Sequence, residues 1–299
     1  MPVLKTFRHD AAMLFVCLIW GANFTVTKLA FAHLSPLAFT AVRFVAGSLL
    51  LLLVARVVEG PAAFPRGRLL WRLVWLGVVG NTLYQLGYVL GLAHSTATNT
   101  SLIISSSPAV VAILAAALGL EETTRRTRAG IALGIAGMVV IVLTRAGGHL
   151  QAAPGDLFTV GALLAWSIYT VGLRGVTGVS SLRLTAWTTC FGTPALLLAG
   201  LPELHRVRWS AVGWGAWGAL AYAVVLSLII GYLIWNRSVR AVGPTRTAIY
   251  MCVTPLVALF VAWAALGERP TWLHAAGAGL IVAGVVLTRL PAGAPPPPD

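Results

Sequence analysis

Residues 36–58 read PLAFTAVRFVAGSLLLLLVARVV, a run in which Arg43 and Arg56 are the only charged side chains. A helix needs about 20 apolar residues to cross the hydrocarbon core of a bilayer, so this run is long enough to span it. Working outward from it gives ten such runs: residues 10–30, 36–58, 70–93, 96–119, 127–145, 155–175, 181–200, 211–235, 243–266 and 271–290. The sequence therefore predicts an all-α polytopic membrane protein with ten transmembrane helices.

The composition excludes an ordinary soluble domain. Apolar residues make up 58% of the 299 positions, charged residues only 10%, and the mean hydropathy is +0.87. A soluble domain is about a quarter charged, because charges keep its surface in water. The net charge of +13 comes from 19 arginines and two lysines that lie between the apolar runs rather than in one patch. We therefore expect the lipid bilayer, and no nucleic acid, as a partner of this chain.

The loop charges predict the orientation in the membrane. If the N-terminus is cytoplasmic, the segments on that side hold 15 of the Lys and Arg residues, those on the other side hold five, and Arg43 lies within a span. An excess of Lys and Arg marks cytoplasmic loops. We therefore expect a multi-pass protein of the plasma membrane with both termini in the cytoplasm.

The second half of the chain repeats the first. Pro108 and Pro255 are 147 positions apart, and Trp20 and Trp166 are 146 apart, with other pairs at similar offsets. Each repeat holds five spans, so the second copy must enter the membrane from the opposite side, as in many secondary transporters. Duplication of a structural scaffold is the alternative. The expected units are a first five-helix repeat over 1–150, a second over 151–290 and a disordered proline-rich tail over 291–299.

Short motifs in both halves add a family resemblance. In chain order they are Trp20-Gly21-Ala22-Asn23-Phe24, Arg43-Phe44, Gly155-Asp156, Ala165-Trp166-Ser167 and Leu266-Gly267-Glu268-Arg269-Pro270. The chain resembles EamA-type transporters of the drug/metabolite transporter superfamily over essentially its whole length. The resemblance implies a ten-helix fold, a central cavity between the halves and export of small metabolites.

The charged residues restrict the chemistry inside the membrane. All eight acidic residues lie at or beyond the end of a predicted span. This argues against a proton relay or a sodium site built on an intramembrane carboxylate. Arg43 is different, because it lies about eight residues into its span, where an unpaired charge costs a few kcal/mol. Arg43 either binds an anionic or carboxylate group of a solute, or it bonds backbone carbonyls and fixes the fold.

Polar and aromatic residues within the spans form one-sided stripes. Asn81, Tyr84, Gln85 and Tyr88 recur at helical spacing, which places them on one face that would be costly to turn toward lipid. Such residues either line a cavity or form hydrogen bonds between helices, worth about 0.6 kcal/mol on average. The predicted substrate-binding residues are Trp20, Asn23, Arg43, Asn81, Tyr84, Tyr88, Ser105, Trp166, Tyr169, Tyr232, Trp235 and Tyr250.

Two prolines lie about 13 residues into equivalent spans. An interior proline removes one backbone hydrogen bond and kinks the helix. We therefore expect Pro108 and Pro255 to act as paired hinges, or else to bend their helices permanently around the cavity.

The sequence points to a transporter without a cofactor. The three cysteines have no metal-ligand spacing, and the spans hold no HExxH motif, no Asp pair and no Ser-His arrangement, so no metal, cofactor or enzymatic activity is expected. We expect a secondary transporter that exports small organic metabolites, such as amino acids or related compounds, by alternating access. The alternative is an uncoupled channel or facilitator with the same walls.

Overall fold

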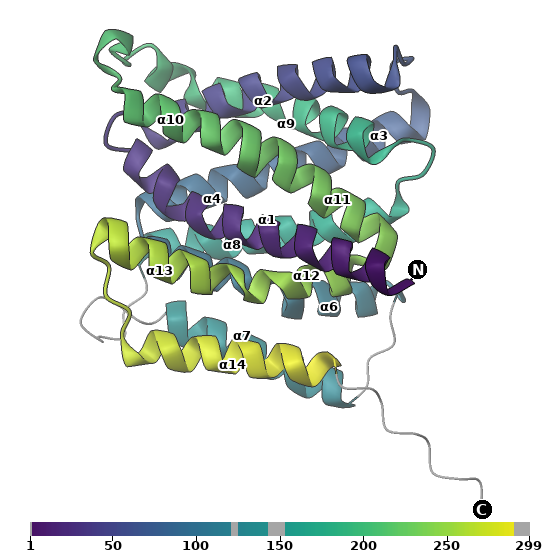
Figure 1. Cartoon of the computed structure of the whole chain (residues 1–299), viewed down its shortest axis with the longest axis vertical. Helices are drawn as coiled ribbons and strands as arrows, with labels where there is room; N and C mark the ends of the chain where they lie inside the picture. Colours follow the sequence, from purple (N-terminus) through teal and green to yellow (C-terminus); the bar gives the residue numbers. More distant parts are fainter. Residues whose placement is uncertain (1, 121–124, 143–152, 290–299) are drawn as a thin grey trace, which may run out of the picture.

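The structure is a bundle of helices (Figure 1). It is a computed structural model that describes residues 2–120, 125–142 and 153–289. Every regular element within these ranges is a helix, which confirms the predicted all-α class. Eight helical passes are long and apolar enough to cross a membrane, and two shorter apolar helices, Arg128–Ile141 and Trp272–Gly284, accompany them, which agrees with ten helices in two repeats. The predicted tail over 291–299 lies outside the described residues.

The first half supplies five passes. Its elements are α1 (Pro2–Ala30), α2 (Pro36–Glu59), α3 (Gly67–Gly77), η1 (Val78–Leu83), α4 (Tyr84–Ala93), α5 (Ala97–Ser105), α6 (Ser107–Ala117) and α7 (Arg125–Val142). The third pass runs through α3, η1 and α4, and η1 is a π-helix. The fourth pass is divided at Ser106, so Pro108 falls in the first turn of α6, where its missing N–H costs no hydrogen bond.

The second half supplies the other five. Its elements are α8 (Pro154–Gly172), η2 (Leu173–Gly175), α9 (Ser181–Leu204), η3 (Trp209–Ala211), α10 (Trp214–Tyr222), η4 (Ala223–Ile230), α11 (Gly231–Val242), α12 (Pro244–Ala248), η5 (Ile249–Cys252), α13 (Thr254–Leu266) and α14 (Trp272–Arg289). The eighth pass contains a second π-helix, η4, and Pro255 begins α13 as Pro108 begins α6. The two halves therefore share their irregular segments as well as their helix order.

Two helix boundaries differ from the sequence prediction by more than the others. The eighth pass continues to Val242 instead of ending at residue 235, so Tyr232 and Trp235 lie well inside the helix rather than at its edge. Near the end of this extension, the guanidinium of Arg240 donates to the carbonyl oxygen of Val179 at 2.8 Å. The first helix begins at Pro2 rather than at residue 10.

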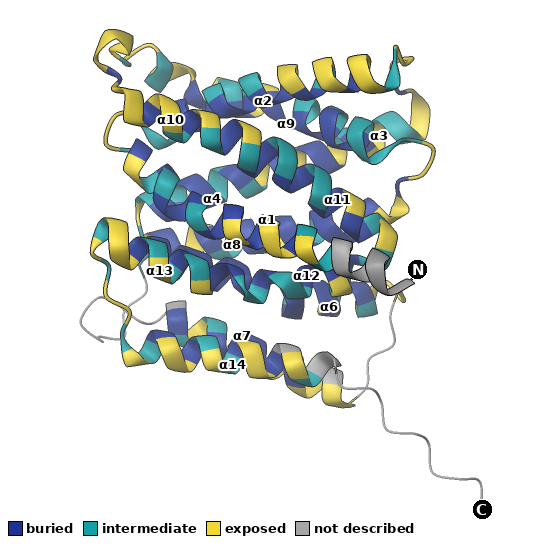
Figure 2. Cartoon of the chain, in the orientation of Figure 1, coloured by how far each residue is buried: buried dark blue, intermediate teal, exposed yellow. Residues whose placement is uncertain are grey.

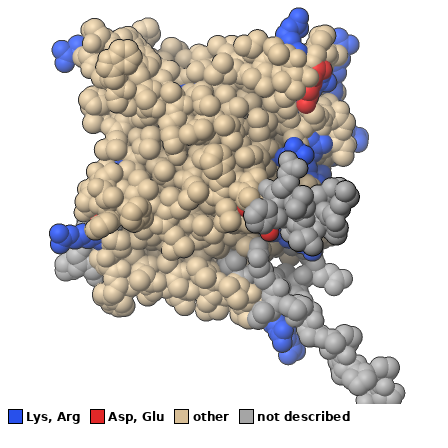
Figure 3. All heavy atoms as spheres, viewed as in Figure 1, with Lys and Arg blue, Asp and Glu red and all other residues tan. Residues whose placement is uncertain are grey.

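The charged residues mark two ends of the bundle. α1 begins and α14 ends at the same end, on the right in Figure 1. We call this the N-end, and the opposite end the far end. On the visible face, Lys and Arg side chains lie at the two ends and the surface between them is almost free of charge (Figure 3). This arrangement is what a bilayer requires, because its core offers charged groups no water.

The outward faces of the helices are exposed and the inward faces are buried (Figure 2). Small residues let some helices approach closely. α7 and α14 lie side by side at one edge of the bundle, and a Cβ added to Gly284 of α14 would lie 2.4 Å from the carbonyl oxygen of Gly130 in α7. Only glycine permits this approach, so these repeat-related helices pack on each other.

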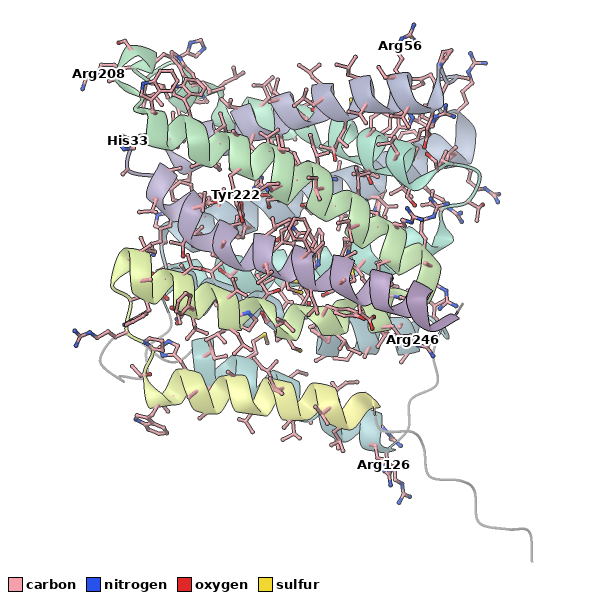
Figure 4. All side chains as sticks on the ribbon, in the orientation of Figure 1. His33, Arg56, Arg126, Arg208, Tyr222 and Arg246 are labelled. Carbon is pink, nitrogen blue, oxygen red and sulfur yellow. The ribbon has the colours of Figure 1, made fainter. Side chains whose placement is uncertain are left out.

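α1 joins the two halves of the bundle. Although it belongs to the first half, Tyr222 of α10 donates to the carbonyl oxygen of Ile19 in α1 at 2.8 Å (Figure 4). Trp20 of α1 donates through its indole nitrogen to the carbonyl oxygen of Ser227 in η4 at 3.0 Å. The residues on this face of α1 therefore lie at the boundary between the halves.

Candidate functional site

Aromatic side chains from both halves meet at the centre of the bundle. Trp20 of α1 lies 5.5 Å from Trp166 of α8 and 5.4 Å from Trp235 of α11, measured between ring centroids. Trp166 in turn lies 4.8 Å from Tyr84 of α4 and 5.4 Å from Tyr232 of α11. Because Trp20 and Trp166 are repeat partners, this cluster lies where equivalent helices of the two halves face each other. Such ring contacts add about 0.5–1.5 kcal/mol each beyond the burial of their area.

Arg43 of α2 lies beside this cluster and is 2% exposed. Its Nε donates to the carbonyl oxygen of Ala223 at 3.1 Å, and its Nη2 donates to the hydroxyl of Ser227 at 3.1 Å. Both acceptors belong to the π-helix η4, where the ordinary hydrogen-bond ladder is interrupted. The remaining nitrogen, Nη1, is buried and has no hydrogen-bond partner in the structure. Arg43 therefore fixes η4 to α2 and still has one donor group to offer.

A small cavity opens between Arg43 and the aromatic rings. Its walls come from passes of both halves and consist of Trp20, Asn23, Phe24, Arg43, Tyr84, Gln85, Tyr88, Ile104, Ser227, Tyr232 and Met251. The free space is about 20 Å³, which is room for about one water molecule. A metabolite therefore fits only when these side chains move apart.

Two side-chain amides hold the tyrosines of this cavity. The Nδ2 of Asn23 donates to the hydroxyl of Tyr88 at 3.1 Å, and the Nε2 of Gln85 donates to the hydroxyl of Tyr232 at 3.0 Å. The carbonyl oxygens of the same two amides are buried without a partner. Among the residues that line the cavity, one donor on a cation and two acceptors are therefore buried without partners.

The predicted residues divide into three groups. Trp20, Asn23, Arg43, Tyr84, Tyr88 and Tyr232 line the cavity. Trp166, Tyr169 and Trp235 belong to the surrounding aromatic cluster, where the hydroxyl of Tyr169 donates to the Oδ1 of Asn236 at 3.1 Å. Asn81, Ser105 and Tyr250 lie apart from the cavity. That any of these side chains binds solute stays a prediction.

Each of the three residues outside the central cavity makes a contact elsewhere in the bundle. Asn81 is on η1 and faces α9, since a Cβ on Gly192 would lie 2.6 Å from its Cβ. Ser105 donates to the carbonyl oxygen of Ser101 at 2.7 Å, within α5. Tyr250 is in the short helix η5 and donates its hydroxyl to Asp10 near the N-end.

The sequence prediction left out Gln85 and Ser227. Gln85 belongs to the same polar stripe as Tyr84 and Tyr88, so its position was available from the spacing. Ser227 lies in an apolar π-helix, 184 positions from Arg43 along the chain, and only the fold brings the two together.

Hydrogen bonds connect the two halves at the far end. The carboxylate of Glu268, after α13, accepts from the backbone N–H groups of Ala97 and Thr98 at 3.0 and 2.9 Å and from the Thr98 hydroxyl at 2.8 Å. It also lies 3.5 Å from the ammonium group of Lys28. Burial alone would raise the pKa of Glu268, but these hydrogen bonds and Lys28 together hold that pKa below its ordinary value. Glu268 is therefore a carboxylate that fastens the start of α5.

Asp156 makes a second connection at the far end. It is 1% exposed and accepts from the hydroxyl of Ser95 and, at 3.3 Å, from the Nδ2 of Asn99. The Oδ1 of Asn99 lies 2.8 Å from the Nε2 of His274 in α14. Residues of the first half are thus held between α8 and α14 of the second.

The N-end holds a much larger cavity, of about 980 Å³, between α1, α11 and α12. Asp10, Arg174, Arg240 and Arg246 contribute the charged groups of its lining, and Figure 4 shows Arg246 at this end. Among the described residues, no three His, Cys, Asp or Glu side chains gather as metal ligands would. This cavity lies at one end of the bundle, and its lining has no residue in common with that of the central cavity.

Comparison with protein-family models matches the EamA-like transporter family twice, over residues 8–143 and 153–290. The two matches together cover most of the chain. The chain belongs to the EamA-like transporter family. It is thus a multi-pass membrane protein, and the family name points to a transporter rather than an enzyme.

Relatives of this EamA-like chain carry transporter names. An uncharacterized transporter of Archaeoglobus fulgidus is 30% identical over 91% of this chain and 93% of its own. The probable amino-acid metabolite efflux pump of Salmonella typhimurium is 28% identical over 94% of each chain. The probable terminal-alkyne amino-acid exporter of Streptantibioticus cattleyicolor is 27% identical over 95% of this chain and 94% of its own. A solved crystal structure shares the fold with a TM-score of 0.70 at 20% identity, covering 94% of this chain and 97% of that one.

Proposed function

We propose that this chain is a secondary transporter that exports small organic metabolites, amino acids or related compounds, by alternating access. The observation that carries the proposal is the contrast between the two ends. A cavity of about 980 Å³ opens at the N-end, beside the hydrogen bond from Tyr250 to Asp10, while at the far end the carboxylates of Glu268 and Asp156 bind the start of α5. The names of the Salmonella and Streptantibioticus relatives support an amino-acid solute.

The central cavity is the proposed solute site. It lies between repeat-related helices, which is where inverted-repeat transporters bind their solutes. Its free space is about one water molecule in size, so binding must move Tyr84, Tyr88 or Tyr232. An uncoupled channel would instead need a wide water-filled path, and the closed far end gives it no support.

The two repeats are the proposed moving units, with a first unit over residues 1–150 and a second over 151–290. Pro108 and Pro255 begin the second helical segments of the fourth and ninth passes, so each pass already has a break at which it can bend. With both termini in the cytoplasm of a plasma-membrane protein, the N-end would face the cytoplasm. Solute would then enter from the cytoplasm, as export requires.

Flux from proteoliposomes tests this function. Vesicles are loaded with a mixture of radiolabelled amino acids, and efflux is measured with and without a proton or sodium gradient. We expect saturable efflux that Tyr84→Ala lowers at least tenfold, because that ring lies against Trp166 beside the cavity. Trp71→Ala is the matched control, since this aromatic is 72% exposed on the bundle surface. Efflux no faster than from protein-free vesicles contradicts the proposal.

A further inference from the structure

Arg43 keeps one guanidinium nitrogen without a partner. Its Nη1 is buried, although the other two nitrogens bond η4. Within the described part of the chain, ion pairs join Asp10, Glu59 and Glu268 to other bases, and no carboxylate pairs with Arg43. A buried charge without a counter-ion costs several kcal/mol. The unused donor therefore suits an anionic group that comes from outside the chain.

The same cavity holds two acceptors without donors. The Oδ1 of Asn23 and the Oε1 of Gln85 are buried and unpaired, and both residues line the space beside Arg43. An acceptor buried without a donor costs about 1–3 kcal/mol. A solute that supplies N–H groups would satisfy these oxygens, and the ring face of Tyr84 or Trp20 would favour a positive charge on it.

The charged lining of the N-end cavity also bears on which solutes reach the centre. Arg174, Arg240 and Arg246 line it together with Asp10 as the carboxylate of the described lining. An excess of positive charge repels cationic solutes and turns the carboxylate of a neutral zwitterion toward the arginines. The N-end cavity therefore disfavours an amine without a carboxylate, as the central cavity does.

We infer that the central cavity recognises a solute with one carboxylate and one ammonium group. The carboxylate accepts a hydrogen bond from the Nη1 of Arg43, and the ammonium donates to the carbonyl oxygens of Asn23 and Gln85. An amine without a carboxylate leaves Arg43 unpaired, and a dicarboxylate finds only one cation. The inference rests on the proposed function, because it names the groups that select the solute at that proposed site.

Matched ligands test the assignment. The thermal stability of the purified protein is measured with L-leucine, with L-leucinamide, which lacks the carboxylate, and with 4-methylpentanoate, which lacks the amine. We expect leucine to raise the Tm, with an apparent affinity at least tenfold higher than that of either analogue. Arg43→Gln should abolish the leucine shift and Arg43→Lys should restore part of it. Equal shifts from leucine and leucinamide, or no shift from any of the three, overturn the inference.

A second variant separates binding from folding. Ser48→Ala removes a buried hydrogen bond of 3.1 Å between α2 and Thr193 of α9, outside the cavity lining, so it should lower the Tm without ligand and keep the preference for leucine over leucinamide. Loss of that preference in Ser48→Ala would mean that Arg43→Gln acts by destabilising α2 and not by removing a ligand contact. Equal efflux of leucine and leucinamide from proteoliposomes would overturn this inference and leave transport intact, whereas absence of all efflux would contradict the proposed function itself.

Discussion

The two ends of the molecule carry related residues in different arrangements. Asp156 and Asp10 are 146 positions apart, and so are Arg174 and Lys28, the same offset that relates the two central tryptophans. At the far end, Lys28 pairs with Glu268 and Asp156 holds the start of α5. At the N-end, Asp10 accepts from the hydroxyl of Tyr250 in the second half, and Asp10 and Arg174 line a cavity of about 980 Å³.

Because related residues are arranged differently at the two ends, whether an end is open or closed depends on conformation and not on residue type alone. An inverted repeat places equivalent groups at both ends, so a closed network at one end has a potential counterpart at the other. In our account the structure is a state open at the N-end, and transport exchanges the two arrangements.

Glu268→Ala should open the far end. The substitution leaves the N–H groups of Ala97 and Thr98 without their acceptor, which costs about 1–3 kcal/mol of stability. In a background without the native cysteines, Ala97→Cys reports the opening, since Ala97 is fully buried. We expect its reaction with an impermeant thiol reagent to accelerate at least tenfold.

Glu203→Ala is the matched control for this experiment. Its carboxylate also accepts from the start of a helix at the far end, at 3.2 and 3.3 Å from the N atoms of Leu37 and Ala38, but it has no contact with α5. It should lower stability and leave the Ala97→Cys rate unchanged. If both variants accelerate labelling equally, the closure does not depend on Glu268.

Lowering the pH should also weaken the hydrogen bonds that Glu268 accepts at the far end. The pKa of Glu268 in the folded protein lies below its ordinary value of 4.5, so its contribution to stability is present above that value and is lost as the pH falls through the lower, folded pKa. The Tm of the wild type should therefore fall more steeply below pH 4.5 than that of Glu268→Gln. Parallel Tm curves for the two proteins would show that the carboxylate does not stabilise the closure.

Arg246→Gln should have the smallest effect. Arg246 is exposed at the N-end cavity, so it acts on solutes only through long-range electrostatic interactions. Because leucine carries no net charge, we expect its efflux rate to fall less than about twofold at low salt and to match the wild type at high salt, where ions screen surface charges. Arg208→Gln, at the exposed far end in Figure 4, is the control and should change neither rate.

Much of the fold could be predicted from the sequence, for physical reasons that hold at particular places. A bilayer demands long apolar helices, so the ten passes are visible as runs. The repeat offset relates Trp20 to Trp166, and the one-sided stripe turns Tyr84 toward other helices, so spacing alone indicates these three as residues of the interior. Arg43 is also recognisable from the sequence, because an unpaired charge inside a span costs a few kcal/mol.

The remaining features of the fold and the site depend on contacts between residues that are far apart in the chain. η1 and η4 are π-helices, and an apolar run shows no sign of the wider turn. For that reason Ser227, which binds Arg43 from η4, could not be found from spacing. The depth of Tyr250 in the ninth span predicts a place in the cavity, but the turn of η5 directs its hydroxyl to Asp10 instead.

Thiol labelling at both ends of the bundle tests whether the two ends open alternately. Ala97→Cys reports the far end, and Ala241→Cys reports the N-end cavity, which Ala241 lines as an exposed residue. Without solute, our account predicts fast labelling of Ala241→Cys and slow labelling of Ala97→Cys. Saturating leucine, or another amino acid shown to be transported, should slow the first and accelerate the second. Rates that do not change with solute, or that change in the same direction at both ends, would contradict alternating access.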